Sequence, residues 1–322
     1  MSKLAASGET RRDRDVSGHP FRLPPPSREL VDWMRDGSLP AGLDLPTFLS
    51  RYDGEMNATG APAPEYRQVS IRKTPDWDLR VGVWMGTGYS RPPGVVLHIH
   101  GGGWRMGNHL THRGLAAVLV QAGFTVVSVD YRRAPKFRFP AAYDDSRAAL
   151  EWCATCIGEF GADPNSIAVL GDSAGANLAA ALAVDQTIDV VRSAVLIYGI
   201  YEYESALIDF ARHGYLPDYV PAADVASLRS DIRLNPIRAA AKFPPTLLST
   251  GDQDWLLHQS ILMHDALKSA GVDHEYRVLP ATPHGYIQLP GHPGYNDGMT
   301  DIIRFLHRHI GNDRNGWGAA GQ

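Results

Sequence analysis

The feature that most constrains this chain is a regular alternation of short apolar runs with helical segments from about residue 94 onward. The runs GVVLHIH (94–100), FTVVSVD (124–130) and SIAVLGD (166–172) are apolar almost throughout, and each is followed by a turn and a helical pattern. Strands that apolar are buried on both faces, which is typical of a parallel sheet covered by helices. We therefore predict an α/β fold with a mostly parallel central sheet flanked by helices. Further strands are expected at 66–73, 78–85, 191–199, 244–251 and 274–280.

Two regions do not follow this alternation. Residues 1–60 are polar, then Pro-rich, then weakly helical, and residues 201–240 are mixed in polarity and helical in places. The second region lies between two expected strands, where insertions cover the carboxyl edge of such a sheet. We predict a core of 61–200 and 241–312, an N-terminal cap segment at 1–60 and a cap insertion at 201–240. The Gly-rich residues 313–322 are expected to be a flexible tail.

Charge and composition exclude several classes of partner. The formal net charge is −4 in 322 residues, which gives no electrostatic reason to bind nucleic acid. The sequence has no run of 18 apolar residues, so no membrane span is predicted. The first residues lack the apolar stretch of a signal peptide. We expect a cytoplasmic protein without integral membrane contact. Its two cysteines, Cys153 and Cys156, fall in the middle or late part of a helical pattern, so we interpret them as reduced packing residues.

The pentapeptide Gly-Asp-Ser-Ala-Gly at 171–175 is the first motif that carries chemistry. It follows an expected strand and begins an expected helix, which is the setting of a nucleophile elbow. A sharp strand-to-helix turn strains the serine backbone and exposes its hydroxyl, and the glycines avoid clashes in the turn. The helix N-terminus adds free N–H groups and a positive dipole. We predict that Ser173 is a nucleophile, with the free N–H groups of the helix N-terminus beneath the developing oxyanion.

A second motif, His-Gly-Gly-Gly-Trp at 100–104, directly follows the strand at 94–100. Three successive glycines leave the backbone unusually accessible, which suits N–H groups aimed at a ligand oxygen. Such a loop lies one strand–helix–strand unit before the serine elbow in hydrolases of this kind. We expect Gly101, Gly102 and Gly103 to contribute to an oxyanion hole. Three residues next to these motifs are expected to line the substrate pocket: Trp104 after the glycines, Asp172 before Ser173, and Trp255 further along the chain.

A nucleophilic serine requires a base and an acid that orients the base. In the order Ser, acid, His, the candidates are the aspartates of Gly251-Asp252-Gln253-Asp254 and the histidine of Pro283-His284-Gly285. Both motifs follow strands, so they should lie at the same sheet edge as Ser173. His284 is the predicted base, and the spacing alone leaves Asp252 and Asp254 open as the acid. No cofactor is implied. A metal site is not expected, because His98 and His100 have no obvious third ligand in the sequence.

The combined motifs resemble the bacterial hormone-sensitive-lipase-like esterases, family IV of the lipolytic enzymes. The similarity covers about 66–310 and includes HGGGW, DYRRAPKFRFPAAYDD, GDSAG and a C-terminal His-Gly-Tyr. It implies an α/β-hydrolase fold with a two-part helical cap, and hydrolysis of short-chain esters by Ser173, Asp254 and His284. It also implies that the oxyanion is bound by the amides of Ala174, Gly102 and Gly103, with Gly101 close by. The acid motif reads Gly-Asp-Gln-Asp-Trp-Leu, which departs from the usual family pattern. Asp254 is preferred because one branch of the family spaces the acid in this way.

The resemblance predicts a serine carboxylesterase acting on short-chain or aryl esters, with a small-molecule ester as its partner. An amidase, arylacylamidase or lactonase could use the same residues, because fold and triad do not fix the leaving group. A receptor without catalysis is the third alternative, and the presence of His284 argues against it. A homodimer is left open.

Overall fold

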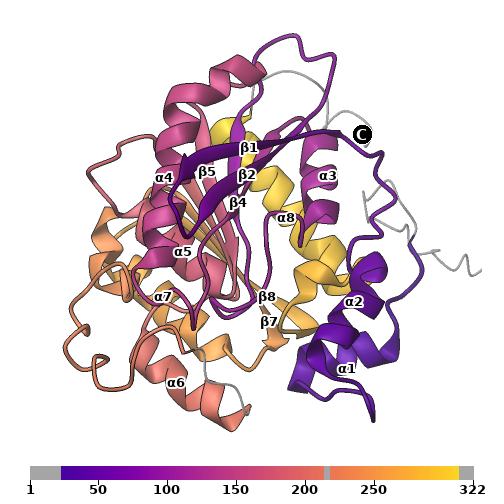
Figure 1. Ribbon diagram of the computed structural model, residues 1–322, viewed down its shortest axis with the longest axis vertical. Helices are drawn as coiled ribbons and strands as arrows, with labels where there is room; N and C mark the ends of the chain where they lie inside the picture. Colours follow the sequence, from indigo (N-terminus) through magenta and orange to yellow (C-terminus); the bar gives the residue numbers. More distant parts are fainter. Residues whose placement is uncertain (1–22, 214–217, 312–322) are drawn as a thin grey trace, which may run out of the picture.

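The central sheet has eight strands in the order β1-β2-β4-β3-β5-β6-β7-β8. The computed structural model describes residues 23–213 and 218–311 (Figure 1). Strands β1 and β2 pair antiparallel, as do β2 and β4, and every other neighbouring pair is parallel. The prediction of a mostly parallel sheet is therefore confirmed. The strands are β1 (Glu65–Lys73), β2 (Asp78–Met85), β3 (Val95–Ile99), β4 (Thr125–Asp130), β5 (Ile167–Asp172), β6 (Val191–Ile197), β7 (Thr246–Gln253) and β8 (His274–Pro283).

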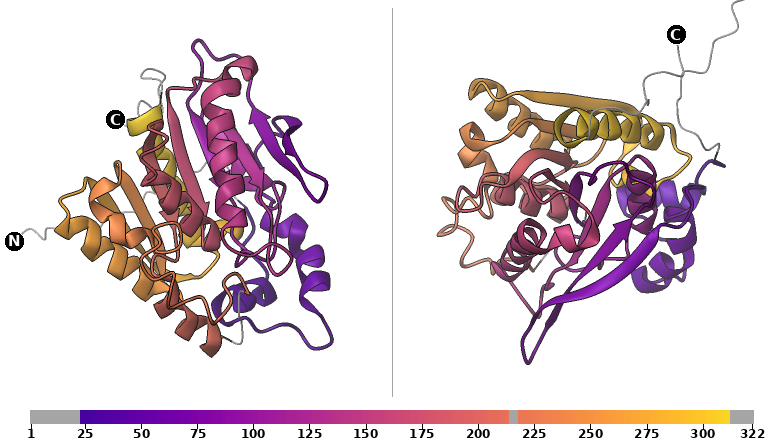
Figure 2. Two further views of the ribbon diagram at one scale, coloured as in Figure 1. Left: turned by 60° about the vertical axis from the view of Figure 1, so that its left-hand side comes forward. Right: turned by 90° about the horizontal axis from the view of Figure 1, so that it is seen from above.

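Helices cover both faces of this sheet (Figure 2). Apolar residues of α4, α5 and α7 join one buried cluster, and those of α3 and α8 join another. All residues of β3 and β5 are buried, which explains why these strands are apolar without alternation. The core helices are α3 (Arg113–Gln121), α4 (Ala141–Cys156), α5 (Ala174–Ala183), α7 (Leu257–Ser269) and α8 (Pro293–Ile310), with short 3₁₀ segments η1 (Ile157–Phe160) and η3 (Tyr286–Gln288).

The two regions outside the alternation are helical where the sequence indicated. The N-terminal segment forms α1 (Arg28–Asp36) and α2 (Leu45–Met56), and the insertion forms α6 (Tyr203–Arg212) and η2 (Pro236–Lys242). Figure 1 shows α1, α2 and α6 at the same end of the molecule. The expected tail at 313–322, and residues 1–22 of the N-terminal segment, lie outside the described residues.

Two buried amide side chains fasten the insertion to the core. Asn177 of α5 donates to the carbonyls of Ile200 and Leu234, both at 3.0 Å. Gln259 of α7 accepts from the amides of Tyr201 and Glu202, both at 2.9 Å. A buried amide that satisfies backbone groups in this way is costly to replace, because its loss leaves those groups unpaired. The two ends of the insertion are therefore held at the helices that flank the serine elbow and the Asp254 loop.

Two minor expectations can be judged from the described helices. Cys153 and Cys156 lie at the end of α4 as free thiols. Cys153 is buried in the core, and burial raises its pKa, which fits a packing residue; Cys156 is only partly buried, so for it the packing role stays a prediction. In the part of the chain that the structure describes, no helix combines the length and apolarity needed to cross a bilayer.

Candidate active site

Ser173 occupies the sharp turn between β5 and α5, with φ 53° and ψ −120°. This is a left-handed φ, which a residue with a side chain adopts only under strain. The flanking glycines make the turn possible: a Cβ on Gly175 would strike the carbonyls of Ile99 and His100, and one on Gly171 would strike the backbone of Gly175. The side chain is placed at the first turn of α5, whose N-terminal amides have no intrahelical acceptor. The geometry is that of the predicted elbow.

His284 and Asp254 approach Ser173 in a hydrogen-bonded series. Nε2 of His284 lies 3.1 Å from Oγ of Ser173, and Nδ1 lies 2.9 Å from Oδ1 of Asp254. An ionised carboxylate accepts, so Nδ1 carries the proton and Nε2 is left to accept from the serine hydroxyl. The Asp254 side chain is fully buried and also accepts from the amide of Leu256 at 2.7 Å. These contacts fix the carboxylate relative to the imidazole.

Asp252 has a different environment, although it is only two residues away. It is exposed, and its Oδ1 accepts from the amide of Thr282 at 3.2 Å, which ties the β7 loop to the end of β8. Of the two aspartates left open by the spacing, Asp254 is therefore the one that contacts His284. Asp252 instead links the end of β7 to the end of β8 through the Thr282 amide.

Aromatic rings surround the imidazole of His284. The ring centroid of Tyr198 lies 4.7 Å from that of His284, and the centroid of Trp255 lies 4.8 Å from it. Tyr198 has φ 39°, so its backbone is also strained beside the site. No sequence motif indicated Tyr198, because its position depends on the end of β6 lying next to β7. Trp255 therefore contacts His284, and its place in the substrate pocket stays a prediction.

The glycine loop after β3 lies against the serine elbow, but its three glycines are not equivalent. The amide of Gly101 donates to Oδ1 of Asp172 at 2.9 Å, so it is already engaged and its predicted place in the oxyanion hole is wrong. Gly102 and Gly103 have φ 108° and 59°, conformations that glycine adopts without strain. The expected donors that remain are Gly102, Gly103 and Ala174.

Asp172 and Trp104 have contacts that differ from those expected of pocket-lining residues. Asp172 is 3% exposed and lies beneath the glycine loop, near Gly101. Trp104 is completely buried, and its ring is stacked on Tyr219 of the insertion at 4.6 Å. Both side chains are covered by other parts of the protein. Their expected place in the substrate pocket is therefore corrected: Asp172 supports the loop, and Trp104 joins the loop to the insertion.

The expectation that His98 has no further metal-ligating residue near it is wrong. His98 is joined by His112 and Asp172, and one ligand atom of each lies within 4.8 Å of the others in a buried cluster. His98 therefore does have neighbours of the metal-ligating type, which no sequence spacing indicated. His100 is not part of this group: its Nδ1 lies 2.7 Å from the Gly101 carbonyl, and burial lowers its pKa to about 3.

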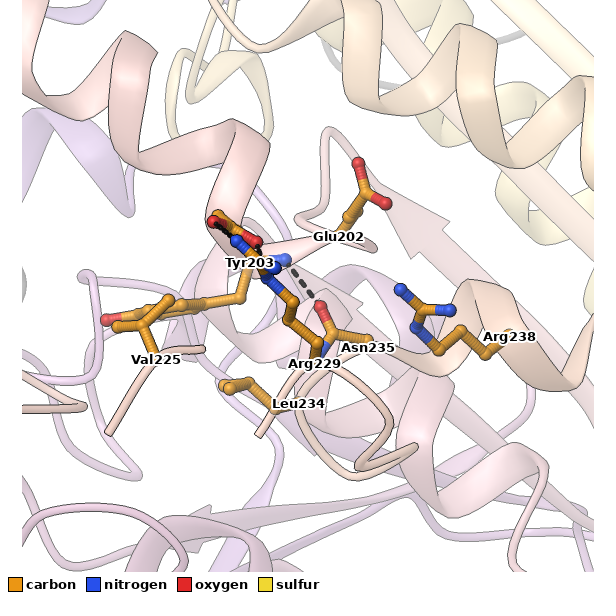
Figure 3. A pocket seen from close by; sticks show the side chains of 8 residues that line it. Glu202, Tyr203, Val225, Arg229, Leu234, Asn235 and Arg238 are labelled. Carbon is orange, nitrogen blue, oxygen red and sulfur yellow. Dashed lines mark hydrogen bonds and ion pairs between the residues drawn. The ribbon is translucent and has the colours of Figure 1, made fainter. Parts of the chain in front are cut away.

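A small hollow on the insertion is separate from these groups (Figure 3). Arg229 and Glu204 form an ion pair at its rim, and Asn235 accepts from the amide of Tyr203 at 2.9 Å. Both interactions join one part of the insertion to another. The lining residues are Glu202, Tyr203, Glu204, Val225, Arg229, Leu234, Asn235 and Arg238. None of them belongs to the predicted site, so the hollow is explained as a feature of how the insertion packs.

Comparison with known proteins defines the class. Residues 96–288 match the alpha/beta hydrolase fold family, and the chain belongs to that family. Within it, the resemblance to the hormone-sensitive-lipase-like esterases is confirmed by its relatives. Carboxylesterase NlhH of Mycobacterium tuberculosis is 35% identical over 219 residues, covering 61% of this chain and 67% of that protein. Ethyl acetate hydrolase of Pseudomonas putida is 30% identical over 233 residues, covering 67% and 73%.

A solved structure agrees with these sequence relatives. The hyperthermophilic esterase of the archaeon Pyrobaculum calidifontis superposes with a TM-score of 0.71 and 25% sequence identity. The similarity covers 88% of this chain and 98% of that one.

Proposed function

We propose that this protein is a serine carboxylesterase in which Ser173 is the nucleophile, His284 the base and Asp254 the acid that orients the base. The broader class, a carboxylic ester hydrolase, follows from the family and from the esterase relatives. The observation that carries the finer proposal is the hydrogen-bonded series from Asp254 through His284 to Ser173 at the strained turn.

The proposed mechanism has two halves. Nε2 of His284 takes the proton of Ser173 as Oγ attacks the ester carbonyl, and the resulting oxyanion accepts from the amides of Gly102, Gly103 and Ala174. His284 then gives its proton to the departing alkoxide, which leaves an acyl-enzyme. Water then attacks the acyl carbonyl while Nε2 of His284 takes its proton. His284 returns that proton to Oγ of Ser173 as the acyl–Oγ bond breaks and the acid product leaves. Asp254 stabilises the imidazolium in both halves without itself becoming protonated.

We further propose that the described residues of 1–60 and of 201–240 form a cover that shapes the pocket. Met34 of α1 lies against Gly285, directly after His284, so a Cβ there would strike its sulfur. From the insertion, the ring of Phe210 lies 5.4 Å from that of Trp255, which in turn contacts His284. Apolar groups on both sides of the histidine would exclude water from an acyl-enzyme and favour apolar acyl or aryl groups.

A panel of p-nitrophenyl esters of increasing acyl length, with matched anilides and lactones, tests this function. We expect the highest kcat/KM for short-chain or aryl esters, and Ser173→Ala serves as the blank. Phe210→Ala should shift the preference toward longer acyl chains, because it enlarges the space beside Trp255. Faster hydrolysis of anilides or lactones would replace the esterase proposal with the alternative activity. An unchanged chain-length profile in Phe210→Ala would contradict the pocket assignment.

A further inference from the structure

The carboxylate of Asp172 is buried beside the nucleophile, yet the proposed mechanism does not use it. Its side chain is 4% exposed, and its closest partner is the Gly101 amide at 2.9 Å. A Cβ on Gly101 would lie 2.5 Å from Oδ2 of Asp172, so the loop and the carboxylate are packed in direct contact. A buried carboxylate is costly unless it is paired or hydrogen-bonded. Asp172 therefore needs partners beyond one amide.

Two histidines provide these partners. Nε2 of His112 lies 3.3 Å from Oδ1 of Asp172, and Nε2 of His98 lies 3.6 Å from the same oxygen. Both rings are 2% exposed, so their charge distribution acts on the carboxylate with little screening by water. The Tyr198 hydroxyl lies 3.5 Å from Oδ2. Burial alone would raise the pKa of Asp172, but His112 and His98 hold it well below its usual range.

The role of His98 follows from its own neighbours. Its Nδ1 lies 3.4 Å from the Ser128 hydroxyl, and burial lowers its pKa by more than the carboxylate raises it. The ring is therefore neutral, and a hydroxyl that donates to Nδ1 leaves the N–H on Nε2, directed at Asp172. The cluster thus presents N–H and O–H groups to one carboxylate.

We propose that Asp172, held by His112 and His98, is a positioning residue that fixes the glycine loop through the Gly101 amide. This rests on the proposed function, since the loop matters only if Gly102 and Gly103 bind the oxyanion. Gly101 directly precedes those donors, so a hydrogen bond that fixes its peptide limits where they point. Asp172 touches no reacting atom; it acts through the loop. The effect should appear in the transition state, where the oxyanion forms, and not in binding of the ester.

The test uses Asp172→Ala, Asp172→Asn and His112→Gln in the full chain, with His109→Gln as the matched control. His109 is a buried histidine of the same region, with Nδ1 3.6 Å from Oδ2 of Asp130, but neither residue contacts the loop amide of Gly101. Loss of one oxyanion donor costs about 10²- to 10³-fold in kcat, so a misplaced loop should cost about 10- to 100-fold.

We expect that loss in Asp172→Ala and a smaller one in His112→Gln, with KM within about twofold. Asp172→Asn keeps an acceptor for Gly101 and should recover part of kcat. Affinity for a trifluoromethyl ketone, which mimics the oxyanion, should fall in parallel with kcat/KM, and His109→Gln should match the wild type. If Asp172 had only a structural role, its substitution would lower the melting temperature without weakening the binding of the trifluoromethyl ketone. If Asp172→Ala does not fold, the kcat values of Asp172→Asn and His112→Gln test the positioning role.

Three results would overturn the proposal or the function beneath it. Unchanged kcat in folded Asp172→Asn and His112→Gln, beside an inactive Ser173→Ala, overturns the positioning role alone. Full activity in Ser173→Ala overturns the proposed function itself. One equivalent of zinc in the purified protein, lost in both His98→Gln and His112→Gln, would show that the cluster holds a metal and overturn the positioning role as stated.

Discussion

The sheet edge that carries Ser173 and the segments that cover it are held by different interactions. Ser173 directly follows β5, which is paired along its length with β3 and β6, and Asp254 and His284 directly follow the paired strands β7 and β8. The cover has no strand ladder to the sheet among the described residues. It is held by side chains, such as the stacked rings of Trp104 and Tyr219 and the partly exposed ion pair of Arg113 with Asp53, and by isolated backbone bonds such as that from the Phe139 amide to the Tyr219 carbonyl. Backbone ladders can fix a reactive geometry, whereas side-chain contacts allow a cover to vary. Changes at the edge should therefore affect rate, and changes in the cover should affect selectivity.

The largest effect is expected at the edge itself. Ser173→Ala removes the nucleophile without disturbing the ladder, and its side chain is only 9% exposed and small. Because a triad acts as a unit, kcat should fall by about 10⁴-fold or more. The melting temperature should stay within a few degrees of the wild-type value, or rise, because the substitution removes one hydroxyl and no packing contact. Stopped-flow and steady-state assays with p-nitrophenyl acetate measure the rate. Turnover near the wild-type value would show that the nucleophile lies elsewhere.

The next effect distinguishes two aspartates of one loop. Asp254→Asn should lower kcat by about 10³- to 10⁴-fold, because an amide can stabilise the wrong tautomer of His284. Asp252→Asn should leave kcat within severalfold and reduce stability slightly, because its carboxylate only accepts from the Thr282 amide near the surface. Measuring kcat and the midpoint of urea unfolding for both variants checks this. An inactive Asp252→Asn beside an active Asp254→Asn would reverse the assignment.

These contrasts also show which parts of the molecule a sequence can predict. The strands, the elbow at 171–175 and the loop at 100–104 were predicted because each depends on a local pattern of apolar residues and glycines. Contacts between residues far apart in the chain were not predicted. The Gly101 amide is engaged by Asp172, 71 residues later, and His98 meets His112 only after α3 packs against the sheet at β2 and β4. The spacing could not separate Asp252 from Asp254, because burial decides between them.

A third effect concerns stability in acid, and it should come from the edge rather than the cover. Burial lowers the pKa of His100 to about 3, although its bond to the Gly101 carbonyl opposes this, and burial also lowers that of His98. Both bind a proton more weakly in the folded state than in the unfolded one. Their contribution to stability is therefore present above about pH 6.5, and is lost as the pH falls toward the folded values. The lowered pKa of Asp172 has the same sign at lower pH.

Urea unfolding between pH 7.5 and 4.5 measures this loss. For each proton that is taken up on unfolding, the free energy of unfolding should fall by about 1.4 kcal/mol for every unit by which the pH is lowered. His100→Gln, which removes one titrating group, should reduce that slope below pH 6. A stability that stays constant from pH 7 to pH 5 would contradict the neutral, buried state of these histidines. Exposed ion pairs of the cover should instead respond mainly to salt.

The smallest effect tests whether edge and cover are independent. Helix α2 meets the first turn of α3 at two points: Arg113 donates to Asp53 at 2.8 Å, and the Gly114 amide donates to Asn57 at 2.9 Å. His112, the residue directly before them, lies against Asp172. A shift of α2 could therefore reach the glycine loop through one turn of helix. The ion pair itself is partly exposed and should contribute only about 0.2–1 kcal/mol to stability.

A double-mutant cycle isolates this link. Arg113→Ala and Asp53→Ala should each lower kcat by about two- to fivefold, and the double variant should lose no more than either one, because both remove the same contact. Arg229→Ala, which breaks an exposed ion pair to Glu204 within the insertion, is the matched control and should leave kcat unchanged. If losses in kcat from Arg113→Ala and Asp53→Ala simply multiply, the pair is not the connection. If neither changes kcat, the cover acts on selectivity alone and the loop is held entirely from within the core.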